Sequence, residues 1–219
     1  MTLMTIHSPV PDYSASRATM IDSQLRPQGV NNPAVVEAMG TIARETFVAA
    51  EARPLAYSDR AVPIGGGRLM SGATVLGLLL TEIAPGPGER ALVVGCGTGY
   101  SATIITALGA TVIGLESDSA LASEARAHGI TVVEGPLEQG WKKAAPYDFI
   151  LIDGAIEYIP DAIIAQLTPA GRLGTSLVEQ GVARLVLGRR AGSGFGLHSI
   201  ADYGAAALPG FVRPRGFTF

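Results

Sequence analysis

Apolar positions in the first third of the chain recur at helical spacing. Residues 17–29 place three apolar side chains on one face, and Pro27 with Gly29 ends the pattern. Asn32 and Pro33 then open a second helix, because Asn is a preferred N-cap and Pro suits the first helical position. The apolar face of this second helix comprises Val35, Val36, Met39 and Ile42. Residues 1–16 carry two prolines and scattered polar groups, which predicts a loosely held arm.

Prolines and glycines interrupt this pattern in the next segment. Residues 52–73 contain Pro54, Pro63 and the run Gly65–Gly67, which predicts a long loop. A helix from about Ala73 to Ile83 follows, and a run of alternating Pro and Gly ends it.

From Glu89 onward, short apolar runs alternate with helical patterns. Strands are predicted at 91–94, 111–115, 130–133 and 147–152, with a fifth starting at Gly171, and helices at 101–108, 120–128 and 162–167. Such alternation is typical of a parallel sheet covered on both faces. Two further runs, 183–188 and 195–200, are too close together for a helix between them, which predicts an antiparallel hairpin. The predicted fold class is a doubly wound, Rossmann-like α/β sheet ending in this hairpin, with an N-terminal helical extension.

Composition narrows the class of protein. The chain has 219 residues, is 47% hydrophobic and carries a net charge of −3, so it has a large core but no strong field for nucleic acid or an anionic membrane. The single cysteine, Cys96, excludes a disulfide framework, and three scattered histidines form no ligand motif, so we expect no metal. Because the first residues lack signal-peptide features and no apolar run is long enough to span a bilayer, we expect a cytoplasmic protein.

A glycine-rich loop is the most informative motif. Gly95, Gly97 and Gly99 follow a predicted strand and precede a predicted helix, where the backbone can approach a ligand closely. Glu116 ends the next strand, at a place where an acid can hold both hydroxyls of a ribose. The alternative is a glycine turn needed only for packing.

Nicotinamide dinucleotides and S-adenosylmethionine can both use this geometry. The dinucleotide fingerprint is G-x-G-x-x-G, whereas the three glycines run at a spacing of two and two, with Ser101 and Ala102 after them. This spacing and the terminal hairpin favour S-adenosylmethionine, which has no pyrophosphate.

Several segments, in order and spacing, resemble the protein-L-isoaspartate (D-aspartate) O-methyltransferase family from about Arg17 to about Gly188. They are Met20–Arg26, Val36–Met39 with Phe47-Val48, Tyr57–Arg60, Pro63–Gly65, Gly140-Trp141, Ala145–Asp148 and Leu167–Leu173. The resemblance implies methyl transfer from S-adenosylmethionine to a carboxylate of isoaspartyl residues in damaged proteins or peptides.

The family motif Gln-Thr-Ile-Ser-Gln-Pro aligns with Arg68–Ala73, in which the serine is retained as Ser71. The resemblance therefore implies that Ser71 is the active-site residue and orients the acceptor; the alternative is a helix N-cap for the segment from Ala73. The changes at Leu69, Gly72 and Ala73 bear on acceptor recognition, and leave open a small acid or another peptide site as acceptor, or a non-catalytic donor binder.

The expected donor site comprises Gly95, Cys96, Gly97, Gly99, Tyr100, Glu116, Ser117, Leu137 and Asp153. Cys96 is interpreted as a small spacer in the loop rather than a reactive thiol. The family carries an acid where this chain has Val93, and an Asp near the adenine where it has Pro136; Leu137 is expected to cover an adenine face. Asp153, at the end of a strand, either holds the donor's amino group in place of the missing acid or caps the following turn.

These inferences combine into one expected domain. We expect a single S-adenosylmethionine-dependent methyltransferase domain over residues 1–219, comprising a helical part at 17–85, a core at 89–202 and a C-terminal segment at 203–219 that folds back as a strand or lid. Nothing in the sequence pattern indicates whether the chain is a monomer or an oligomer.

Overall fold

The computed structural model describes residues 12–192 and 194–213, and its N-terminal part is helical. The elements are α1 (Tyr13–Met20), the π-helical turn η1 (Ile21–Leu25), η2 (Arg26–Gln28), α2 (Pro33–Thr41), η3 (Arg44–Phe47) and η4 (Ala50–Leu55). The first helix begins earlier than predicted, because the Asp12 carboxylate accepts hydrogen bonds from the N–H groups of Ser14 and Ala15. Of the predicted arm, residues 1–11 lie outside the described residues.

Two of the predicted helix boundaries rest on local capping, and both are confirmed. Gly29 adopts a φ of 92° and ends the first helical segment, a conformation that favours glycine. Asn32 caps α2 by accepting from the N–H groups of Ala34 and Val35, with Pro33 at the first helical position.

The predicted long loop at 52–73 is wrong in part, since it contains an antiparallel hairpin. Strands β1 (Val62–Gly65) and β2 (Arg68–Met70) pair across Gly66 and Gly67. The run Gly65–Gly67 has positive φ throughout, 103°, 56° and 71°, which only glycine adopts readily. The hairpin is followed by α3 (Ala73–Ile83), at the predicted bounds.

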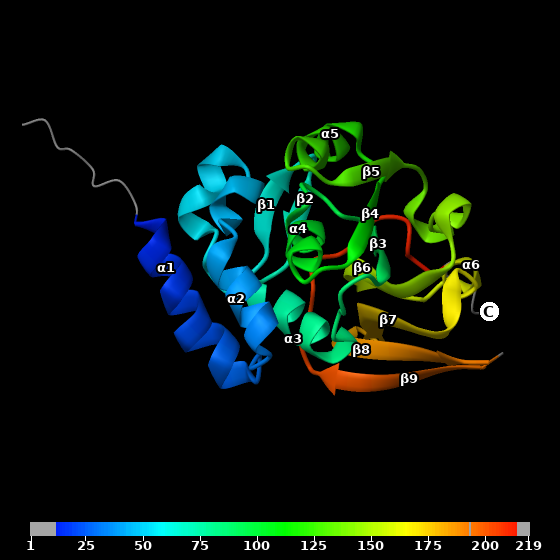
Figure 1. Cartoon of the computed structure of the whole chain (residues 1–219). Helices are drawn as coiled ribbons and strands as arrows, with labels where there is room; N and C mark the ends of the chain where they lie inside the picture. The colour runs from blue at the N-terminus through cyan, green and yellow to red at the C-terminus, as the bar shows by residue number, and fades with distance from the viewer. Residues whose placement is uncertain (1–11, 193, 214–219) are drawn as a thin grey trace, which may run out of the picture.

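The remaining strands form one sheet in the order β5-β4-β3-β6-β7-β8-β9. Their bounds are β3 (Arg90–Val94), β4 (Thr111–Glu116), β5 (Thr131–Glu134), β6 (Tyr147–Ile156), β7 (Leu167–Glu179), β8 (Val182–Ala191) and β9 (Gly194–Ala201). The pairs from β5 to β7 are parallel, whereas β7–β8 and β8–β9 are antiparallel. Figure 1 shows this order from β5 beside α5 at the top to β9 at the bottom. The predicted doubly wound sheet with a terminal hairpin is confirmed.

The helices between the strands are α4 (Tyr100–Ala107), α5 (Ser119–Ala127) and α6 (Asp161–Ile164), with the 3-10 turns η5 (Leu137–Gln139) and η6 (Lys142–Ala144). The prediction of a helix at 162–167 is wrong in its extent. The N–H of Tyr147 donates to the carbonyl of Gln166 at 2.8 Å, and Leu167 already pairs with β6. Thr168 precedes Pro169, which also disfavours helix there.

Alternate residues of the strands face two separate apolar cores, as the period of two requires. Val93 and Leu151 face the core that holds α3, α4, α5 and the N-terminal helices. Leu92 and Val94 face the other core, which is closed by the short α6, by η5 and by Leu208 and Phe211 of the C-terminal segment. Among the described residues, no helix has the length and apolar character that crossing a membrane requires.

Candidate functional site

The glycine-rich loop joins β3 to α4 at the carboxyl edge of the sheet. Gly95, Gly97 and Gly99 have φ values of 73°, 54° and 97°. A Cβ on Gly95 would come within 2.5 Å of Leu208, and one on Gly97 within 2.7 Å of Ile64. Each of these two positions therefore needs glycine for its backbone angle and for the space above it.

Glu116 ends β4 beside this loop and is fully buried. Its Oε2 accepts the N–H of Gly97 at 2.8 Å, and its Oε1 accepts the N–H groups of Ser117 at 2.8 Å and Asp118 at 3.2 Å. The Nη1 of Arg68 donates to the same Oε1 at 2.9 Å. A buried carboxylate is tolerated when it is paired and hydrogen-bonded, and Glu116 meets both conditions.

Arg68 is the site residue that sequence reasoning missed. It begins β2, its side chain is only 10% exposed, and its Nη2 approaches the carbonyl of Gly95 at 3.4 Å. The hairpin sits over the loop, because Ile64 covers Gly97 and Gly66 lies against the carboxylate of Asp118. The signal was a lone arginine inside a glycine-rich segment, with a partner 48 residues away.

The loop, the hairpin and β6 enclose a small cavity. It is lined by Ile64, Arg68, Leu69, Met70, Gly95, Cys96, Gly97, Thr98, Tyr100 and Asp153. The buried hydroxyls of Tyr100 and Ser101 have no hydrogen-bond partner among the described residues. Ser101 nevertheless lies close enough to the carboxyl of Asp153 to oppose the rise in its pKa, and Arg44 does the same for Tyr100.

Asp153 lies on β6 at the wall of this cavity. Burial raises the pKa of its carboxyl, while Ser101 and the guanidinium of Arg68 oppose that shift. The alternative interpretation, in which Asp153 caps a following turn, is wrong, because β6 continues to Ile156.

Ser71 is buried directly after β2. Its Oγ accepts the N–H of Ala206 at 3.1 Å, and its carbonyl accepts from Nη2 of the buried Arg44. The N-cap alternative for Ser71 is wrong, because Gly72 occupies the cap position of α3. The N–H of Thr74 instead donates to the carboxylate of Asp59 at 3.3 Å.

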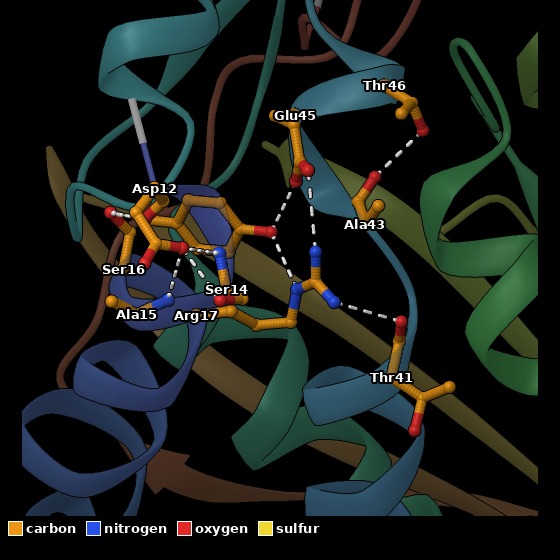
Figure 2. A network of polar contacts seen from close by, with 10 residues as sticks. Asp12, Ser14, Ala15, Ser16, Arg17, Thr41, Ala43, Glu45 and Thr46 are labelled. Carbon is orange, nitrogen blue, oxygen red and sulfur yellow. Dashed lines mark hydrogen bonds and ion pairs between the residues drawn. The ribbon is translucent and has the colours of Figure 1, made fainter. Parts of the chain in front are cut away.

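A network of polar contacts holds the segment that carries Arg44. Figure 2 shows Arg17 of α1 between the carboxylate of Glu45 and the carbonyl of Thr41. Arg17 also donates to the hydroxyl of Tyr57 at 2.8 Å, and that hydroxyl donates to Glu45. Burial and the Glu45 carboxylate raise the pKa of Tyr57 to about 12, so the phenol stays protonated. The N-terminal helix thereby fixes η3 and, through Arg44, the backbone at Ser71.

The C-terminal segment crosses the carboxyl edge of the sheet. The N–H of Ala155 donates to Ala206 at 2.7 Å, and the N–H of Leu208 returns a bond to Ala155 at 2.9 Å. Leu208 then packs over Gly95 and Gly154. The expectation that this segment folds back is confirmed for residues 206–213, which form a single bridge, Ala155 to Ala207, and no strand; residues 214–219 lie outside the described residues.

Three other expected donor-site residues, Cys96, Ser117 and Leu137, differ in where they lie. Cys96 lines the cavity, and burial raises the pKa of its thiol to about 12, with the carboxylates of Glu116 and Asp153 adding to the shift. Such a thiol is unreactive at neutral pH, in agreement with the spacer interpretation. Ser117 supplies its N–H to Glu116. Leu137 is 2% exposed and packs in the core below the sheet, and it does not line the cavity.

The donor set of this cavity fits S-adenosylmethionine. A glycine loop that lets a ligand approach the backbone closely, a buried acid at the end of β4 and the carboxyl of Asp153 match a ligand with a ribose diol and a charged amino-acid end.

Comparisons with known proteins agree with the sequence resemblance. The family model "Protein-L-isoaspartate(D-aspartate) O-methyltransferase" matches residues 15–194. A protein-L-isoaspartate O-methyltransferase of Methylorubrum populi is 39% identical over 165 residues, covering 73% of this chain and 78% of its own length. One from Koribacter versatilis is 38% identical over 168 residues, covering 74% of this chain and 76% of its own length.

Solved structures share the fold. A putative protein-L-isoaspartate O-methyltransferase from Plasmodium falciparum, in complex with S-adenosyl-L-homocysteine, has a TM-score of 0.76 at 17% identity, over 92% of this chain and 100% of that one. Another protein-L-isoaspartate O-methyltransferase has a TM-score of 0.76 at 19% identity, over 89% of this chain and 67% of that one.

Proposed function

The chain belongs to the protein-L-isoaspartate (D-aspartate) O-methyltransferase family, and we propose that it methylates a carboxylate of isoaspartyl residues in damaged proteins and peptides. The observation that carries the proposal is the family match over residues 15–194, which spans the loop, Glu116 and Ser71. The enzyme is a methyltransferase that uses S-adenosylmethionine.

When bound, S-adenosylmethionine supplies a methyl group on a positively charged sulfur. The acceptor carboxylate is already ionised at neutral pH, since an unperturbed aspartyl pKa is about 4. The chain therefore needs no strong base, and its residues act by holding the two reactants in line and excluding water. Such positioning contributes ~7–11 kcal/mol in favourable systems.

We assign Ser71 to orienting the acceptor. Its Oγ uses a lone pair to accept the N–H of Ala206, and a serine hydroxyl also has a proton to donate. A carboxylate takes such a proton well, because hydrogen bonds to charged groups are the stronger ones. Arg44 supports this role because its Nη2 donates to the carbonyl of Ser71 and so fixes the backbone there.

We assign the donor site to the residues around the cavity. Glu116 would bind the ribose hydroxyls, Asp153 the amino group, and the backbone of the glycine loop the remainder of the donor. Leu137, which packs in the core that also holds Val94 and Leu208, stays the expected cover for an adenine face.

The experiment uses labelled S-adenosylmethionine and a short isoaspartyl peptide beside its normal-aspartyl twin. We expect label to enter the isoaspartyl peptide as a base-labile methyl ester and the twin to stay unlabelled. Equal labelling of both peptides, or labelling of neither while donor binding is intact, would contradict the proposed acceptor.

A further inference from the structure

One oxygen of Glu116, Oε1, already accepts more hydrogen bonds than its two lone pairs readily take. An ionised carboxylate offers about four lone-pair sites. Oε1 is approached by the Nη1 of Arg68, by the N–H groups of Ser117 and Asp118 and, at 3.4 Å, by the Ser117 hydroxyl, whereas Oε2 accepts the N–H of Gly97 alone among the described residues. A ribose diol that binds both oxygens of Glu116 must therefore displace a donor from Oε1.

Arg68 is the donor that can leave. The three backbone N–H groups belong to the loop after β3 and the turn after β4, whose positions are fixed by the sheet. Arg68 reaches Glu116 through a flexible side chain from the short strand β2, and its second contact, to the carbonyl of Gly95, is long at 3.4 Å. Arg68 lines the cavity, whereas the fully buried Glu116 lies behind it and does not.

We propose that Arg68 closes the donor cavity over Glu116 and that, once a donor displaces it, its guanidinium binds the acceptor carboxylate. The inference rests on the proposed function and makes Arg68 a residue that selects the acceptor. Arg68 stands in the position where the aligned family motif has glutamine, so the feature belongs to this chain rather than to that motif.

The charges around the cavity direct the released guanidinium toward an anion. Arg68 is the only basic residue among those that line the cavity in the described part of the chain. Arg44 is buried, and its Nε and Nη2 already bind the carbonyls of Ala56 and Ser71. Because the donor carries a positive sulfur, a freed Arg68 beside it favours a negatively charged acceptor over a neutral one.

The location of Arg68 also suits the acceptor. It lies on the same short strand that leads into Ser71, three residues before the hydroxyl that we assign to the acceptor. An arginine can take both oxygens of a carboxylate in a fork, which fixes its plane as a single hydroxyl cannot. Arg68 and Ser71 would then hold the carboxylate together.

The proposal predicts an order of binding, because the acceptor needs a cation that is released only when donor or product occupies the cavity. Isothermal calorimetry on the wild-type protein tests this with an isoaspartyl peptide titrated in the absence and presence of saturating S-adenosylhomocysteine. We expect about tenfold tighter peptide binding in its presence, as when a competent state populated at about a tenth becomes dominant. Equal affinities would overturn the proposal.

Arg68→Gln installs the residue of the family motif and separates the two roles. Loss of the competing guanidinium should tighten S-adenosylhomocysteine binding several-fold, whereas loss of the cation should raise the peptide KM about tenfold or more. A purely structural role would weaken both. Arg184→Gln is the matched control, because its pair with Asp202 is exposed and lies on the distant hairpin, and it should change neither.

Unchanged or weaker S-adenosylhomocysteine binding in Arg68→Gln would overturn the closing role, and an unchanged peptide KM would overturn the acceptor role. Should Arg68→Gln fail to fold, the same measurements are made on Arg68→Lys. Because an ammonium group cannot make the two-pronged contact of a guanidinium, the changes in S-adenosylhomocysteine affinity and peptide KM should have the same signs and be smaller. The S-adenosylhomocysteine titration needs no acceptor. It therefore tests the closing role even if the wild-type protein fails to label isoaspartyl peptide, a result that would instead contradict the proposed function.

Discussion

Ser71 lies at the meeting point of the hairpin, the buried Arg44 and the C-terminal segment. We expect Ser71→Ala to lower kcat by roughly ten- to a hundredfold, because a hydrogen bond to a charged group contributes ~1.5–3 kcal/mol. The N–H of Ala206 also loses its acceptor, so the free energy of unfolding should fall by about 1 kcal/mol. Initial rates and urea unfolding on one preparation measure both quantities.

The affinity for S-adenosylhomocysteine separates this role from general damage, since it should stay within about twofold of wild type when only an acceptor contact is lost. Ser199→Ala, at an exposed position of β9, provides the control for loss of a hydroxyl. Wild-type turnover per folded molecule in Ser71→Ala would remove Ser71 from the reaction.

Asp153 is held where its own charge is unfavourable. Burial raises the pKa of its carboxyl in the folded state above the unfolded value of about 3.9. The folded protein therefore binds this proton more tightly than the unfolded chain does, and stability is lost as the pH rises from about 4 through the raised pKa. Asp153→Asn cannot titrate, so its gain in unfolding free energy over wild type should be smallest near pH 4 and largest above that pKa.

Urea unfolding of the wild-type protein and of Asp153→Asn across this pH range measures the difference in their free energies of unfolding. If Asp153 binds the donor's amino group, the same variant should bind S-adenosylhomocysteine more weakly at neutral pH while being more stable. A gap in stability that stays constant with pH would show that the carboxyl is not shifted by burial.

Among the elements, α3 is capped from a distance. Gly72 occupies its N-cap position without a side chain, and the carboxylate of Asp59 takes the N–H and the hydroxyl of Thr74 instead. We expect Asp59→Ala to lower the free energy of unfolding by about 1–2 kcal/mol, the cost of a lost cap. Asp202→Ala, whose carboxylate is 80% exposed in a surface pair, should cost less than about 0.5 kcal/mol in the same urea experiment.

Elements with local signals were predicted well. The bounds of α3 and the cap of α2 followed from apolar spacing, proline and asparagine within a few residues. The β1–β2 hairpin was missed, because strands of four and three residues around three glycines have the composition of a loop. Its pairing is supported by tertiary contacts, such as Ile64 over Gly97, which no local pattern contains.

The candidate site divides in the same way. The glycine loop and Glu116 form one βαβ unit, so their proximity was readable from spacing. Arg68 and Leu208 reach the loop from segments before and after the core, and only the folded chain brings them there. Where Leu137 lies depends on how η5 packs, which no local pattern contains.

At the scale of the whole molecule, the two faces of the sheet are covered unequally. The face toward α3, α4 and α5 has helices of eight to eleven residues, whereas the other has the four-residue α6 and short 3-10 turns. The C-terminal segment completes this second face, since Leu208 and Phe211 belong to its core. The same segment passes Ala155 and Gly95, so it joins the packing of the sheet to the wall of the donor cavity.

Two neighbouring residues of that segment test how much the fold depends on it. Phe211 is 1% exposed and Val212 is 65% exposed. Phe211→Ala should lower the free energy of unfolding by ~3–5 kcal/mol through lost burial and the cavity left behind. Val212→Ala should stay within about 0.5 kcal/mol. Equal, small effects in urea unfolding would mean that the segment only rests on the sheet. A large loss confined to Phe211→Ala would make the segment part of the core, so that Leu208 is held over the donor loop by the stability of the fold itself.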